Sequence, residues 1–164
     1  MPPDDCVLVE YLRRSYHAVD GLWFVLVEQQ SDFDAALALD QRVWEVLAKV
    51  QARKARELTG RSGNRPSDLA ECFGLKLAAD GHAFDAVQDE GHVRFAIHGC
   101  PWVALLRRSS REHLAPRIAE AICCTEGRVW CAEFGGEYEF GMSARACDGA
   151  DRCEMRFTRL TVVA

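Results

Sequence analysis

The sequence has no long hydrophobic run, no excess of positive charge and no apolar leader segment. No stretch approaches about 18 uninterrupted apolar residues, so we expect no membrane span. The first five residues are acidic and lack a charged-then-apolar run, so we expect no signal peptide. The net charge of −5 gives no broad positive field, which disfavours nucleic acid as a partner. These absences predict a cytoplasmic protein.

The length and composition are those of an ordinary globular protein. The chain has 164 residues, of which 49% are hydrophobic and 27% charged. A chain of this size can bury a core without disulfide or metal staples. We therefore expect a single domain over 1–164, with a helical part at 1–80 and a cysteine-rich α+β part at 81–164.

Three helices are expected in the first half of the chain. Apolar residues recur at spacings of three and four over 5–30, which predicts the first helix. Ser31-Asp32 offers an N-cap for a second helix at 33–59, which Gly60 ends. A loop rich in helix-breaking residues follows at 61–66, and a third helix is expected at 67–79.

The second half is expected to contain two hairpins separated by helices. Residues 83–87 and 93–98 alternate in the manner of strands around a turn, and a second pair is predicted at 137–147 and 153–163. Helices are expected between the hairpins, at 102–108 and 112–134. The order αααββααββ predicts an α+β fold, with N-terminal helices packed on a four-stranded antiparallel sheet.

The eight cysteines are distributed unevenly along the chain. The first 99 residues contain only Cys6 and Cys72, so the spacing is not that of a small disulfide-rich domain. The last 65 residues contain the other six, which are Cys100, Cys123, Cys124, Cys131, Cys147 and Cys153. Thiolates bind zinc or act as nucleophiles, so this part of the chain is where we expect the chemistry.

A zinc site is one hypothesis for these cysteines. Cys147 and Cys153 flank the turn of the last predicted hairpin, and Cys123 and Glu126 are three apart on a predicted helix and share a face. Two elements that each present two ligands could form a four-coordinate zinc site. Buried packing of the thiols, with one of them reactive, is the alternative.

A reactive thiol at Cys100 is the second hypothesis. Cys100 lies two residues after His98 on a predicted strand, so both side chains point to the same face. A neighbouring imidazole can lower the pKa of a thiol and so activate it as a nucleophile. A buried Cys100 beside a solvent-facing His98 is the alternative. Glu126 or His98 would be the group that moves the proton.

Polar residues interrupt the apolar faces of the first two helices. His17 lies near Gly21 on one helix face, which indicates either a pocket or a plain helix crossing at Gly21. An apolar pocket with a few convergent polar groups would suit a small molecule. The residues expected to line it are His17, Trp23, Asp40, Trp44 and Gln51.

The motifs of the second half resemble two known families. Cys100-Pro101-Trp102, Cys123-x-x-Glu126, Cys147-x-Gly149 and Cys153-Glu-Met-Arg-Phe157 are similar to motifs of the L-2-amino-thiazoline-4-carboxylic acid hydrolase family. The resemblance covers about 93–160, and the region 16–58 looks like an uncharacterised bacterial branch. The closing cysteine motif also resembles the vinyl-4-reductase domain, a small-molecule-binding module that in some sensors carries zinc.

The first resemblance implies a hydrolase that opens a small cyclic amidine-like or other C–N bonded substrate at a cysteine and carboxylate centre. The second implies a non-catalytic small-molecule-binding module with structural zinc. We therefore expect a small-molecule partner and no nucleic acid or membrane partner. A homodimer is left open as the assembly.

Overall fold

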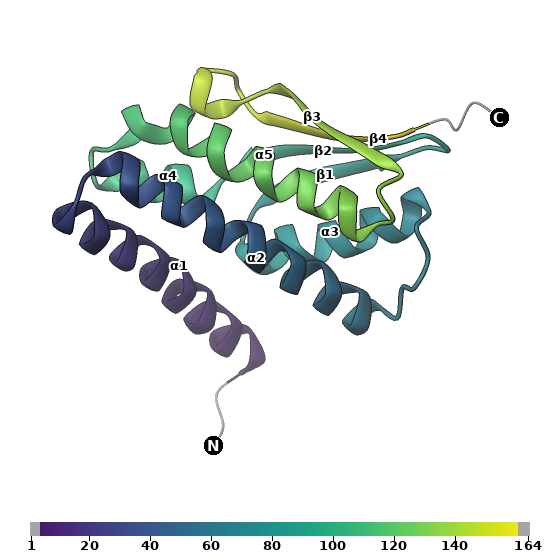
Figure 1. Ribbon diagram of the computed structural model, residues 1–164. Coiled ribbons are helices and arrows are strands. Elements are labelled where there is room, and N and C mark those ends of the chain that lie inside the picture. Colours follow the sequence, from purple (N-terminus) through teal and green to yellow (C-terminus); the bar gives the residue numbers. More distant parts are fainter. Residues whose placement is uncertain (1–3, 161–164) are drawn as a thin grey trace. The chain divides into compact units, whose positions relative to one another are not determined.

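The structure, a computed structural model, describes residues 4–160 as five α-helices, two short 3₁₀ helices and four strands (Figure 1). The chain divides into two compact units, one that ends at Asp40 and one that begins at Gln41. Each unit is described by itself. The single domain expected from the length stays a prediction.

The first unit is built from two helices joined by a tight turn. Helix α1 (Asp5–Gln30) begins where Asp4 Oδ1 accepts a hydrogen bond from the backbone N–H of Cys6 at 3.0 Å. Helix α2 (Phe33–Thr59) begins where Asp32 Oδ1 accepts from the N–H of Ala35 at 2.8 Å. Both caps satisfy backbone donors that a helix start leaves unpaired. The predicted N-cap at Ser31-Asp32 is thereby confirmed.

The second unit contains the rest of α2 and a four-stranded antiparallel sheet of order β1-β2-β4-β3. Helix α3 (Pro66–Asp80) precedes the hairpin of β1 (Ala83–Gln88) and β2 (His92–Gly99). Helix α4 (Pro101–Arg108), the 3₁₀ turn η1 (Glu112–Leu114) and α5 (Ala115–Glu133) follow. Strand β3 (Tyr138–Ala144), the 3₁₀ turn η2 (Ala146–Asp148) and β4 (Cys153–Arg159) complete the unit. The predicted α+β class and element order are confirmed.

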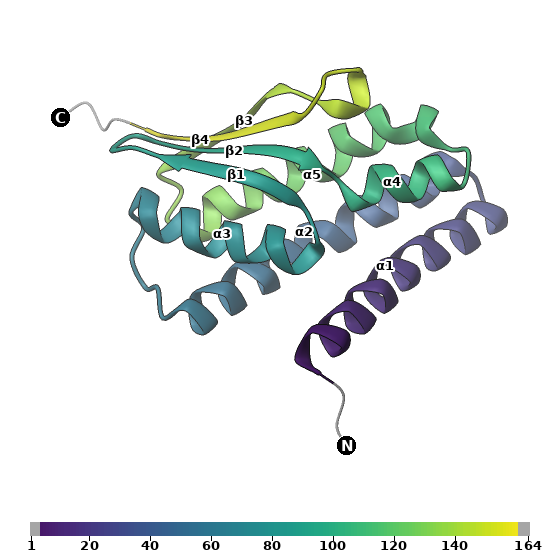
Figure 2. The ribbon, with the colours of Figure 1, turned by 180° about the vertical axis from the view of Figure 1, so that it is seen from behind.

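Helices α3 and α5 lie against the same face of this sheet (Figures 1 and 2). The strand residues on that face are buried, as in Val93, Phe95 and Ile97 of β2. Their neighbours in sequence, such as His92 and Arg94, are exposed on the opposite face. An antiparallel sheet commonly covers one face and leaves the other in water. Side chains that act in a protected environment therefore come from the helix-covered side.

Aromatic rings form the centre of the core between helices and sheet. The ring of Phe73 on α3 lies 5.0 Å from Trp130 of α5, 5.0 Å from Phe157 of β4 and 5.1 Å from Phe95 of β2. Its contacts are tilted or edge-to-face, the geometry that aromatic quadrupoles prefer. One side chain thus joins α3, α5 and two strands.

Arg56 of α2 fastens the loop before α3 to the end of α5. Its guanidinium donates to the carbonyl of Gly63 at 2.8 Å, to Oδ1 of Asn64 at 2.7 Å and to the carbonyl of Glu133 at 3.0 Å. The same group lies 3.8 Å from the ring centroid of Phe134. Carbonyls at a helix C-terminus lack intrahelical donors, so an arginine there stabilises the helix end.

Both strands of the second predicted hairpin differ from the observed ones, and the helix predicted over 112–134 is divided into the 3₁₀ turn η1 and α5. The strand expected at 137–147 ends at Ala144 after an irregularity between Met142 and Ala144, and η2 follows. Arg145 pairs with Asp148 and Gly149 adopts φ +95°, which closes this turn. The last strand ends at Arg159, and the part of its predicted range beyond residue 160 lies outside the described residues.

We expect Gly127→Ala to destabilise the protein by about 1–3 kcal/mol. A Cβ at Gly127 would lie 2.3 Å from ring atoms of Phe140, whose ring is held 5.1 Å from Phe157. Gly21→Ala is the control, because a Cβ there would meet no described atom within 4 Å. This control should raise stability by about 0.5–1 kcal/mol through helix propensity. Urea denaturation measures the free energy of unfolding of both variants. Equal changes in this free energy would contradict the close packing of Gly127 against Phe140.

Candidate active site

An ammonium group lies between two carboxylates inside the second unit. Lys76 Nζ is 2.6 Å from Glu126 Oε1 and 3.2 Å from Asp80 Oδ2. Lys76 and Asp80 are one turn apart on α3, and Glu126 lies on α5. All three side chains are at most 6% exposed. The pair Lys76–Glu126 therefore joins the two helices that cover the sheet.

The electrostatics of this cluster keep the lysine charged. Burial alone would lower the pKa of Lys76, but the carboxylates of Glu126 and Asp80 outweigh it and raise the pKa above its usual value. Burial raises the pKa of Glu126, and the ammonium of Lys76 opposes part of that shift. A carboxylate with a raised pKa is a stronger base than one in water.

Three thiols border the cluster. Cys123 lies one turn before Glu126 on α5, and its thiol interacts electrostatically with Glu126, with Lys76, and with the thiols of Cys100 and Cys153. Each of the three cysteine residues is half-buried. Cys123 thus has Cys100, Glu126 and Cys153 of the predicted site within electrostatic reach.

Burial raises the pKa of two of these thiols, Cys123 and Cys100, and so keeps them protonated at neutral pH. Burial, followed by the carboxylate of Glu126, raises the pKa of Cys123 well above its ordinary value. Burial also raises the pKa of Cys100, although the backbone N–H groups of Val103 and Trp102 oppose it. A thiol in this state needs a base to take its proton before or during nucleophilic attack.

His98 pairs with Asp85, and the hypothesis that it activates Cys100 stays a prediction. The imidazole Nε2 of His98 lies 2.8 Å from Oδ2 of Asp85 on the neighbouring strand, with the His98 side chain 45% exposed. The pKa of Cys100 is raised, as burial dictates. The exposed imidazole is bonded to Asp85 on β1, so His98 has no place in the buried cluster.

The predicted zinc ligands do not surround one point. Cys147 lies in η2 with its Sγ 3.9 Å from Asp148 Oδ1, and Cys153 Sγ accepts the backbone N–H of Ala146 at 3.2 Å. Glu126 is 2.6 Å from the ammonium of Lys76, a position that repels a divalent cation. Within residues 4–160, no three His, Cys, Asp or Glu side chains form a metal-binding group. The arrangement of these four residues does not fit a zinc ion. Zinc in this protein stays a prediction.

The residues expected to line a substrate pocket fall in both units. The first unit contains His17 and Trp23 of α1 and Asp40 of α2, and the second contains Trp44 and Gln51 of α2. Within the second unit, Trp44 packs edge-on against Trp102 of α4 at 5.7 Å, and its ring lies 5.8 Å from Lys76 Nζ. Trp44 therefore borders the cluster, and the wider pocket stays a prediction.

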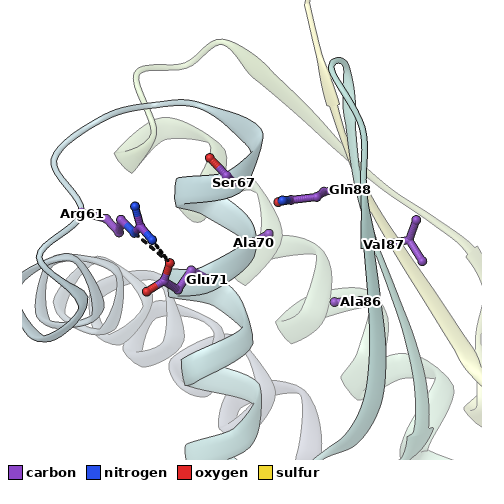
Figure 3. A pocket seen from close by; sticks show the side chains of 7 residues that line it. All are labelled: Arg61, Ser67, Ala70, Glu71, Ala86, Val87 and Gln88. Carbon is purple, nitrogen blue, oxygen red and sulfur yellow. Dashed lines mark hydrogen bonds and ion pairs between the residues drawn. The ribbon is translucent and has the colours of Figure 1, made fainter.

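A shallow hollow of about 390 Å³ lies elsewhere in the second unit, between α3 and strand β1. Gln88 points into it toward Ser67, whereas Val87 points away (Figure 3). Arg61 Nε donates to Glu71 Oε2 at 2.7 Å on its helix side. None of its lining residues belongs to the buried cluster. It contains no thiol or imidazole and offers no nucleophile of the kind expected here.

Sequence reasoning missed Lys76 and Asp80. Both are buried on α3, together with Asp68 in its first turn and with the apolar Leu69, Cys72, Phe73 and Leu77. A lysine and an aspartate four apart within an apolar stripe are a pair that a helix can bury together. Charged side chains are almost never fully buried unless paired, so this interruption of the stripe was a readable signal.

We expect Lys76→Met to lower the free energy of unfolding by about 3–5 kcal/mol at neutral pH, because it leaves buried carboxylates without a partner. Lys54→Met is the control, since Lys54 pairs with Glu57 at 2.6 Å where both side chains are more than 60% exposed. That change should alter stability by less than about 1 kcal/mol. Chemical denaturation measures both, and similar losses would contradict the burial of the Lys76 pair.

The loss of stability caused by Lys76→Met should grow as the pH rises. Burial holds the pKa of Glu126 above its unfolded value, and removing the ammonium raises it further. The folded variant then binds a proton that the unfolded chain releases, so its stability falls as pH rises above about 4.5. Unfolding of variant and wild type at pH 4.5 and 7.5 measures this. A difference that grows toward acid pH would contradict it.

Comparison with known proteins places the chain in a family and a fold. A chain of a trafficking protein particle complex subunit 3 from Naegleria fowleri, covalently bound to palmitic acid, has a similar structure with a TM-score of 0.52. The two are 12% identical, and the match covers 96% of this chain and 98% of that chain. No curated protein matches the sequence.

No helix within residues 4–160 is long and apolar enough to cross a membrane.

Residues 4–111, which include α1 to α4 and the lysine of the cluster, match a protein family described as a family of unknown function. The chain is a member of that family, DUF6125.

Proposed function

We propose that the second unit hydrolyses a small substrate at a C–N bond, with Cys123 as nucleophile, Glu126 as proton carrier and Lys76 as electrostatic stabiliser. The observation that supports this most is the contact of 2.6 Å between Lys76 and Glu126 beside the thiol of Cys123. A thiol can act as the nucleophile in acyl and amidine chemistry, a carboxylate can take its proton, and an ammonium group can stabilise the negative charge that develops.

The first half of the reaction forms a covalent intermediate. Sγ of Cys123 attacks the amidine or amide carbon while Glu126 takes the thiol proton. The charge that develops on the substrate heteroatom is stabilised by the ammonium of Lys76. When the C–N bond breaks, Glu126 returns the proton to the leaving nitrogen, which departs as an amine. The product is a thioester or thioimidate on Cys123.

The second half restores the enzyme. Glu126, again a carboxylate, takes a proton from a water molecule that attacks the same carbon. The C–S bond breaks, and the proton returns to the sulfur of Cys123. One water is consumed and one C–N bond is cleaved, with no external oxidant or reductant.

The pKa directions suit this mechanism. A protonated thiol cannot attack by itself, but the carboxylate one helical turn away has a raised pKa and accepts the proton more readily. Lys76 keeps its charge because two carboxylates share it. Perturbed titratable groups with defined partners are typical of active sites.

This assignment moves the nucleophile from the predicted Cys100 to Cys123. The thiol of Cys123 interacts most strongly, after burial, with Glu126, whereas the main opponents of burial at Cys100 are backbone N–H groups. Glu126 keeps its predicted role. The reaction class agrees with what the resemblance to the aminothiazoline-carboxylate hydrolase family implies, and that resemblance stays a prediction.

Stable acylation of a thiol is a second candidate, favoured by the covalently bound palmitic acid of the structurally similar chain. In this version Cys123 accepts an acyl group from an acyl thioester, whose own thiol leaves with the proton that Glu126 removed. The intermediate then persists, because no water attacks it. Intact mass after incubation with palmitoyl-coenzyme A distinguishes the two: a lasting increase of one acyl group indicates acylation.

Alkylation by 2-chloroacetamidine tests the hydrolase proposal. The reagent carries an amidine and loses chloride when a thiolate attacks its methylene carbon. We expect Cys123 to be alkylated in the folded protein, and Glu126→Gln to slow its alkylation by about 10²-fold or more, as loss of a general base does. Peptide mass mapping identifies the cysteine, and circular dichroism verifies that the variant is folded.

Cys100→Ser is the matched control, because it removes a neighbouring thiol and leaves the pair of Cys123 and Glu126 in place. In this variant Cys123 should be alkylated by 2-chloroacetamidine at the wild-type rate. Alkylation confined to the exposed Cys6, or a folded Glu126→Gln variant that reacts as fast as wild type, would refute the proposal.

A further inference from the structure

We infer that α1 is a self-association surface, through which two copies of the chain pair in antiparallel orientation. The surface is a line of exposed side chains along α1, here named the α1 stripe. Its members are Leu8, Leu12, Ser15, Val19, Leu22 and Leu26.

The α1 stripe is apolar, continuous and exposed. At about 100° per residue its members fall within an arc of about 80°, and at 1.5 Å per residue they span about 27 Å. The five apolar members are between 44% and 62% exposed. Between Leu8 and Leu26 no charged residue falls in this arc. Apolar rows on a helix that face water mark interaction sites.

The sequence spacing of the α1 stripe is the same when it is read from either end of the helix. Its members are separated by 4, 3, 4, 3 and 4 residues. An isologous dimer needs a surface that matches itself after a two-fold rotation. When two copies of α1 pair in antiparallel fashion about residue 17, every member meets another member, as in Leu8 with Leu26, Leu12 with Leu22 and Ser15 with Val19. A three-and-four pattern is also that of helix pairs that interlock side chains.

The ends of the stripe select the antiparallel orientation. Asp4 and Asp5 precede it, and Gln29 and Gln30 follow it; all four are exposed. Antiparallel pairing places the two aspartates beside the two glutamines of the second copy, which can donate hydrogen bonds to carboxylates. Parallel pairing would place aspartates beside aspartates, which repel each other.

The charge of α1 favours a second copy over a membrane surface. Helices that lie on membranes carry Lys or Arg beside their apolar face. The arginines of α1, Arg13 and Arg14, lie about 140° and 240° from Leu8 and pair with Glu10 at 3.3 and 2.7 Å. The borders of the α1 stripe therefore offer no cation to anionic lipid.

Sedimentation velocity on the full chain, from about 1 to 100 μM, tests the inference. A single helix pair is a small interface, so we expect a monomer–dimer equilibrium within this range. Leu12→Gln with Leu22→Gln removes two apolar contacts per copy and should raise the dissociation constant at least about a hundredfold. Val9→Gln is the control: Val9 is 50% exposed on α1 but lies about 100° from Leu8, and it should leave the constant unchanged.

Orientation is tested by engineered cysteines in a Cys6→Ser background. Leu8→Cys with Leu26→Cys should give links between residue 8 of one copy and residue 26 of the other, identified by peptide mass mapping. Links of 8 to 8 would overturn the antiparallel arrangement. A wild-type protein that is monomeric at 100 μM would overturn self-association. This holds even if the double glutamine variant is less stable than wild type, and even if the protein binds anionic vesicles.

Discussion

The second unit depends on the buried ion pair between Lys76 of α3 and Glu126 of α5. The two helices approach the same face of the sheet, and their charged groups meet at 2.6 Å, with Lys76 Nζ 5.6 Å from the ring centroid of Phe73. A buried pair of this kind adds little stability compared with apolar residues, yet breaking it is strongly destabilising. The pair therefore restricts which changes the core tolerates.

The same constraint explains the state of the cysteines. Six cysteines in the last 65 residues predicted a reactive centre, and the structure places three of them around one charged cluster. Burial raises the pKa of Cys100 and of Cys123, so neither is a free thiolate at neutral pH. Reactivity then depends on a proton acceptor, and Glu126 is the carboxylate whose charge reaches Cys123. The proposed catalysis needs no lowered thiol pKa, only the proximity of a strong base.

The fold could be predicted from the sequence because its signals are local. The cap at Asp32, the turn of the first hairpin, where Asp89 Oδ1 accepts the N–H of Gly91, and the periodicity of the helices each act within a few residues. The partners of the site could not be predicted in this way. Glu126 was selected because it lies among cysteines, but its partner Lys76 is 50 residues earlier, and only packing of α3 beside α5 brings them together. The partner of His98 was missed for the same reason, since Asp85 belongs to the neighbouring strand.

The pH dependence of Cys123 alkylation in the wild type tests the central claim most directly. If Glu126 takes the thiol proton, the rate should rise as this carboxyl ionises, above its usual pKa near 4.5, and then stay nearly flat to pH 8. An unassisted thiol of raised pKa would instead react about tenfold faster for each pH unit up to pH 9. That second profile would contradict the role given to Glu126 and to the pair on which the site is built.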